Sequence, residues 1–76
     1  MNKTVEYYVN LPYTLIVLPD DEAGGYDIEV AELAGCVTFA DRWEDIPAQV
    51  KDAIRAWVDG ALATGDSIPE PRAERV

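Results

Sequence analysis

Carboxylates are the side chains of this sequence whose number and grouping could support chemistry or binding. The acids that stand out are Asp20, Asp21, Glu22, Asp27, Glu29, Asp41 and Glu44. Grouped carboxylates can hold divalent metal ions that activate water, or they can form an acidic surface that attracts a basic partner. The rest of the composition bears on which of these two kinds of site is present.

Partners for catalytic chemistry are scarce in this sequence. It contains no histidine and a single cysteine, Cys36. Without histidine there is no Ser-His or Cys-His pair to activate a nucleophile, and a zinc site lacks its usual ligands. One thiol cannot form a disulfide within the chain, and we expect it to behave as a small buried hydrophobe. We therefore predict no catalytic residue, no bound metal and no cofactor.

Charge is the most unusual bulk property of the chain. Fifteen acidic residues against six basic ones give a net charge of −9. Residues 4–41 contain eight acids and neither Lys nor Arg. Such a surface repels nucleic acid and anionic membranes and attracts basic proteins, although small domains also carry excess acid for solubility. We expect a basic protein partner and no direct contact with nucleic acid or membrane.

A long strand is predicted near the start of the chain. Every odd position from Val5 to Val17 is apolar, which favours a strand over about 4–18 with one buried face. Pro12 cannot donate to a ladder and marks a break, a bulge or an edge position. The opposite set of positions contains three further apolar residues, Tyr8, Ile16 and Leu18. They are either ordinary surface hydrophobes or a self-association surface.

The remaining elements follow from local signals. Turn-forming and acidic residues between Pro19 and Gly25 predict a hairpin loop, with strands over about 25–31 and 36–41. Apolar residues at helical spacing predict a helix over about 45–64, with Asp45 as N-cap and Gly65 as its C-terminal stop. Prolines predict an extended tail over 66–76.

The order strand, strand, strand, helix predicts an α+β domain, in which one helix packs across a three-stranded antiparallel sheet. We treat residues 1–76 as one domain, since a chain of 76 residues has room for no more. A domain this small has a thin stability margin, which favours a partner chain and a homo-oligomer, most simply a dimer. No targeting or membrane-spanning segment is evident, so we expect a cytoplasmic protein.

Several landmarks, in order, resemble the HicB family of antitoxins. They are Tyr13–Leu18, the acidic Gly-Tyr hairpin of 19–26, the Leu-Ala-Gly-Cys turn within 32–38, and the Ile-Pro-Glu-Pro exit within 65–71. The resemblance implies a degenerate ribonuclease H-like fold, with a possible short fourth strand after the exit. Ala34 stands where the family usually has proline. No helix-turn-helix or ribbon-helix-helix module follows Val76, so we expect no C-terminal DNA-binding domain and carry over no operator binding.

The resemblance implies an antitoxin that covers the RNA-binding surface of a basic, HicA-like mRNA-cleaving toxin. The seven acids named above are the toxin-binding candidates. One alternative is a homo-oligomeric adaptor without a toxin. Another is a degenerate ribonuclease H-like nuclease, but that chemistry needs carboxylates converging on magnesium from inside the first strand. Here the strand predicted over 4–18 contributes only Glu6, near its start, and the acids of 20–22 spread along a loop.

Overall fold

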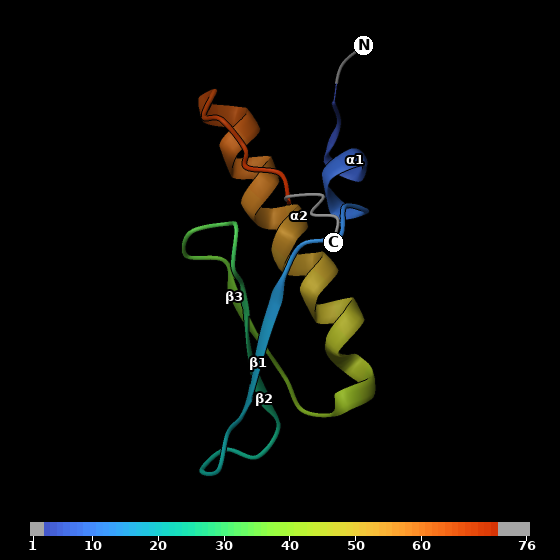
Figure 1. Ribbon diagram of the computed structural model, residues 1–76, viewed down its shortest axis with the longest axis vertical. Helices are drawn as coiled ribbons and strands as arrows, with labels where there is room; N and C mark the ends of the chain where they lie inside the picture. The colour runs from blue at the N-terminus through green and yellow to red at the C-terminus, as the bar shows by residue number, and fades with distance from the viewer. Residues whose placement is uncertain (1–2, 72–76) are drawn as a thin grey trace, which may run out of the picture.

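The computed structural model describes residues 3–71, which form a two-layer arrangement of sheet and helix (Figure 1). The elements are α1 (Val5–Val9), β1 (Leu15–Pro19), β2 (Tyr26–Val30), β3 (Val37–Ala40), a single 3₁₀ turn (Trp43–Asp45) and α2 (Ile46–Thr64). The α+β class with a three-stranded antiparallel sheet and one long helix is confirmed. The short helix α1, which precedes the sheet, was not predicted.

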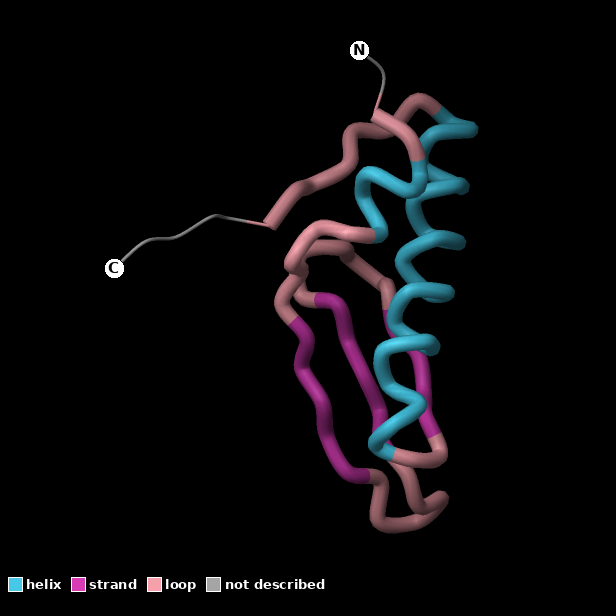
Figure 2. The backbone as a smooth tube through the Cα atoms, turned by 90° about the vertical axis from the view of Figure 1, so that its right-hand side faces the viewer, coloured by secondary structure: helices cyan, strands magenta, loops and turns pink. Residues whose placement is uncertain are grey.

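The sheet is an antiparallel meander in the order β1-β2-β3. Pro19 lies opposite Tyr26, and Tyr26 lies opposite Ala40, so these three residues form the last row at one end of the sheet. The helix α2 covers one face, and the other face has no helix over it (Figure 2). Both chain segments that leave this last row, the β1–β2 hairpin and the β3–α2 connection, therefore emerge at the same end of the molecule.

The core lies between the sheet and α2. Its most deeply buried side chains are Ile28, Val30, Leu33 and Val58. The helix contributes one stripe of buried residues, namely Ile46, Val50, Ile54, Val58 and Ala61. This stripe follows the predicted helical spacing, because only one face of a surface helix can meet the sheet.

The ends of α2 agree with the sequence analysis in position but not in every detail. The helix stops at Gly65, whose φ of 76° is the left-handed conformation that glycine adopts without strain. Pro47 lies in the first turn, where its missing N–H costs no intrahelical bond. Asp45 occupies the N-cap position, but its side chain makes no capping hydrogen bond. It lies instead 3.9 Å from the guanidinium of Arg42.

The strand predicted over 4–18 is wrong in its first half. Residues 5–9 form α1, which begins where the Thr4 hydroxyl accepts a hydrogen bond from the backbone N–H of Tyr7. The chain then turns at 10–14 and enters β1 at Leu15, so Pro12 marks a break. The apolar residues at odd positions predicted a strand, but Val5, Tyr8 and Val9 also fit the i, i+3, i+4 spacing of a helix.

Tyr8 consequently belongs to the core and not to an outward face. It is only 8% exposed, and it meets Tyr7 edge to face with ring centroids 5.0 Å apart. The helical geometry of α1 turns Tyr8 and Val9 inward together, whereas a strand would have placed them on opposite faces. Tyr8 is therefore removed from the predicted self-association surface. Ile16 and Leu18 remain exposed.

The tail predicted to be extended over 66–76 is described only as far as residue 71. Residues 66–71 contain neither helix nor strand. Residues 72–76, and with them the possible fourth strand, lie outside the described part of the chain.

Candidate protein-binding surface

The β1–β2 hairpin carries the three consecutive acids, and they do not play equal parts. The Asp20 carboxylate accepts hydrogen bonds from the backbone N–H groups of Glu22 and Ala23, each at 3.0 Å. These bonds, led by the one from Ala23, lower the pKa of Asp20. Asp21 and Glu22 project into solvent. Asp20 therefore shapes the loop that presents its two neighbours.

Glycines seat this hairpin against the end of the sheet. Gly24 and Gly25 have φ angles of 74° and 77°, which disfavour other residues. A Cβ atom on Gly25 would lie 2.5 Å from the carbonyl oxygen of Ala40 and close to the ring of Phe39. The hairpin thus lies directly against β3 and the start of the β3–α2 connection.

The β3–α2 connection adds two more of the predicted acids at the same end. Asp41 and Glu44 are exposed, and Glu44 lies 3.5 Å from the guanidinium of Arg42. Between them Trp43 is 63% exposed, touching Tyr26 edge to face with ring centroids 5.4 Å apart. A large exposed ring at the base of an acidic loop is typical of a protein contact surface.

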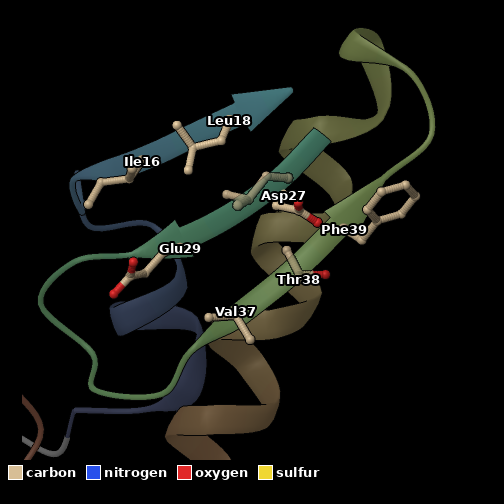
Figure 3. Close-up of a pocket in the computed structure, with 8 residues that line it drawn as sticks. Ile16, Leu18, Asp27, Glu29, Val37, Thr38 and Phe39 are labelled. Carbon is tan, nitrogen blue, oxygen red and sulfur yellow. The ribbon is translucent and has the colours of Figure 1, made fainter. Parts of the chain in front are cut away.

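The uncovered face of the sheet continues from this end. It carries three pairs of side chains, Ile16 and Leu18 from β1, Asp27 and Glu29 from β2, and Val37 and Phe39 from β3 (Figure 3). Together with neighbouring atoms they line a shallow hollow of about 510 Å³. Partial loss of water, and then the charge of Asp20, raises the pKa of Asp27. Both acids of this face, Asp27 and Glu29, are exposed.

The exit segment is anchored at the opposite end of the molecule. The Tyr13 hydroxyl donates to the carbonyl oxygen of Pro69 at 2.6 Å. The Glu70 carboxylate accepts from the Tyr7 hydroxyl at 3.0 Å and from the Lys3 ammonium at 2.7 Å. These bonds, first from Lys3 and then from Tyr7, lower the pKa of Glu70. We call this set of contacts the exit latch.

The chain was compared with protein families, with known proteins and with solved structures. Residues 13–75 match the family model described as "HicB_like antitoxin of bacterial toxin-antitoxin system". The chain belongs to the HicB-like antitoxin family. It is also 30% identical over 66 residues to the UPF0150 protein Ta0767 of Thermoplasma acidophilum, covering 87% of this chain and 94% of that protein. No solved structure matched.

The shared landmarks of the HicB-like domain are explained by its contacts. Glu32 accepts two hydrogen bonds from Thr14, one from the backbone N–H at 2.9 Å and one from the hydroxyl at 2.7 Å. Partial loss of water alone would raise the pKa of Glu32, but these two bonds and one from the backbone of Glu32 itself together lower that pKa. Trp57 donates from its indole nitrogen to the carbonyl oxygen of Ala34 at 2.8 Å. Both contacts tie the Leu-Ala-Gly-Cys turn to its neighbours.

The seven predicted binding acids of the HicB-like domain fall into two places. The β1–β2 hairpin and the β3–α2 connection lie at the same end of the molecule (Figure 1). We call the five acids that they carry, Asp20, Asp21, Glu22, Asp41 and Glu44, the acidic end. Asp27 lies one row further in, and Glu29 two residues beyond it, both on the uncovered face. Sequence reasoning missed Val37 and Phe39, which share that face, and it missed the exit latch.

Carboxylates of the HicB-like domain do not converge as a metal site would require. Within residues 3–71, no three carboxylate or thiol side chains lie close enough together to hold a metal ion. Cys36 is buried, and burial raises the pKa of its thiol, which disfavours the reactive thiolate. Neither helix in the described part of the chain has the length and apolar character needed to cross a bilayer.

Proposed function

We propose that this domain neutralises a basic, HicA-like toxin that cleaves mRNA, by covering the surface with which the toxin binds RNA. The observation that carries the proposal is the acidic end, where four exposed acids and the half-buried Asp20, from two separate connections, lie together beside Trp43. The family supports an antitoxin role, and the charge supports a basic target. In this proposal the domain acts in the cytoplasm, as a binding protein and not as an enzyme.

The acidic end would act in two ways. Proteins that bind RNA do so mainly through Lys and Arg side chains that contact phosphates, so an acidic surface competes for the same side chains. Its field also speeds encounter with a basic partner, because opposite charges steer diffusion before contact. Exposed charges are screened over about 8 Å at physiological ionic strength, so this steering depends on salt.

Surface-immobilised binding kinetics at two salt concentrations tests the proposal. The partner to be tested is any short basic protein encoded next to this gene, with its RNA cleavage disabled. The variant Asp20→Asn, Asp21→Asn, Glu22→Gln changes the net charge from −9 to −6 and keeps the Asp20 side-chain oxygen that shapes the loop. We expect this variant to associate more slowly at low salt, with little change in dissociation rate or melting temperature.

A matched control removes three charges elsewhere. Asp52, Asp59 and Asp66 lie on α2 and just after it, away from the acidic end, and all three are exposed. Replacing them by Asn gives the same net charge of −6, so the two variants differ only in where the charge is lost. Equal association rates for the two variants would show that the hairpin does not steer the encounter. Absence of binding by the unaltered domain would overturn the antitoxin proposal itself.

One alternative function has a structural observation in its favour. Ile16 and Leu18 are exposed on the uncovered sheet face, which would suit a homo-oligomeric adaptor. The dimer expected from the sequence stays a prediction. Light scattering at micromolar concentration decides it, since an adaptor of this kind would be a dimer without any toxin present.

A further inference from the structure

The uncovered face of the sheet has a regular composition that its strand register creates. Two cross-strand rows run across it, Ile16–Glu29–Val37 and Leu18–Asp27–Phe39. Each row places one carboxylate on the central strand between two apolar side chains on the outer strands (Figure 3). Because alternate residues of a strand share a face, the two carboxylates lie about 7 Å apart along β2.

The apolar part of this face is unusually exposed. Val37 is 65% exposed, Leu18 60% and Ile16 42%. The opposite face of the sheet is covered by α2, and no helix or strand of residues 3–71 covers this side. A contiguous exposed apolar patch on a small domain usually marks an interaction site.

Within residues 3–71, the charges of this face lack a cationic counterpart. Among residues 3–71, the ion pairs join Lys3 to Glu70, Arg55 to Glu6, and Arg42 to its neighbours Glu44 and Asp45. None of these cations reaches Asp27 or Glu29. A partner that covers the face must therefore bring its own positive charge, because an unpaired carboxylate is costly to remove from water.

A second copy of this chain fits the face poorly. Face-to-face pairing would bring Asp27 and Glu29 of both copies together, placing four carboxylates in one apolar interface. Like charges set opposite each other oppose association, and each copy also carries a net charge of −9. The complementary occupant is a cationic one.

We propose that this face is the docking surface for a basic protein that lays apolar side chains over Ile16, Leu18 and Val37 and sets Lys or Arg on Asp27 and Glu29. The inference rests on the proposed function, since the toxin would supply this segment. The acidic end then speeds association with the toxin, and the uncovered face slows its dissociation. The two surfaces are continuous, because Asp27 lies one row from the hairpin.

The first test measures the dissociation constant, Kd, to separate the stability of the complex from the rate of encounter. The variant Asp27→Asn, Glu29→Gln keeps the shapes of the side chains and removes both charges from the face. We expect its Kd for the inactivated basic protein to rise about 30-fold, mainly through faster dissociation, since buried charge pairs act on the off-rate. The control Asp52→Asn, Asp59→Asn loses two charges on α2 and should change Kd less than about 3-fold.

The second test locates the partner without relying on affinity. Two variants each carry one photo-crosslinking residue. It replaces Val37 on the uncovered face in the first variant and Asp59 on the outer side of α2 in the second. We expect the basic protein to crosslink at position 37 and not at position 59. Melting curves of both variants confirm that each is folded, which is expected because both positions are exposed.

The outcomes are distinct for the two proposals. If the Asp27→Asn, Glu29→Gln variant still binds tightly and no crosslink forms at position 37, the face is not the docking surface, although the antitoxin function stands. Failure of the unaltered domain to bind any basic protein encoded beside its gene overturns both. If light scattering detects a dimer, and Leu18→Ser makes it monomeric, the face binds a second copy of this chain. That result would refute the proposal that a basic protein docks there.

Discussion

The exit latch allows a change in stability to be predicted from a single hydrogen bond. Tyr13 is buried, and its hydroxyl donates to the Pro69 carbonyl oxygen at 2.6 Å. Tyr13→Phe removes this bond and leaves the ring in place. A hydrogen bond of this kind contributes about 1 kcal/mol to the free energy of unfolding. Pro69 is exposed, so water can replace the lost donor, and no further penalty is expected.

This loss is measurable in so small a domain. For a domain of this size, about 1 kcal/mol corresponds to a fall in melting temperature of roughly 4–8 °C. In urea, with a slope of about 1 kcal/mol per molar, the midpoint should fall by about 1 M. Thermal and urea unfolding followed by circular dichroism measure both quantities.

The matched control is Tyr26→Phe. Its hydroxyl forms no hydrogen bond to any residue that the structure describes, so its removal should change stability by less than about 0.5 kcal/mol. If Tyr13→Phe costs no more than Tyr26→Phe, the hydroxyl of Tyr13 does not hold the exit segment, and the reasoning fails.

Titration supplies an independent check on the same residue. Burial, and then the charge of Glu70, raises the pKa of Tyr13 to about 12. A raised phenol pKa stabilises the folded state while the group is protonated. This contribution is complete below the ordinary value of about 10 and is lost as pH rises toward about 12. Ultraviolet absorbance should show an ionisation step near pH 12 that vanishes in Tyr13→Phe, while Tyr7, whose pKa its hydrogen bond to Glu70 also raises, still ionises.

Three further predictions address the hairpin, the latch and metals. Gly25→Ala should destabilise by about 3 kcal/mol in chemical unfolding, because it adds a clash with Ala40 to left-handed strain, whereas Gly24→Ala, with nothing nearby, should cost about 1 kcal/mol. Glu70→Gln should lower the melting temperature at neutral pH but not at acid pH. Because the pKa of Glu70 is lowered, its carboxylate stabilises the folded state above about pH 4.3, and this stabilisation is lost as pH falls through the lowered pKa. Magnesium, manganese or zinc should leave the melting temperature unchanged, and a saturable rise would contradict the non-catalytic proposal.

Local signals determined much of the fold in advance. The helical stripe of α2, its stop at Gly65 and the glycines of the hairpin follow from short-range geometry, which a single segment specifies by itself. Likewise, the order of landmarks was enough to identify the family. The sequence shows that Asp20 to Glu22 are consecutive and that Asp41 and Glu44 follow one strand end, but not that these two sets lie at the same end of the molecule.

The tertiary structure alone decided where these groups meet. Residues 5–9 satisfy both helix and strand spacing, and only packing of α1 against α2 selects the helix. Strand register, which no local pattern specifies here, placed Asp27 and Glu29 between Val37, Phe39 and β1. The exit latch joins residues more than fifty positions apart, and such contacts depend on how the whole chain closes rather than on any segment within it.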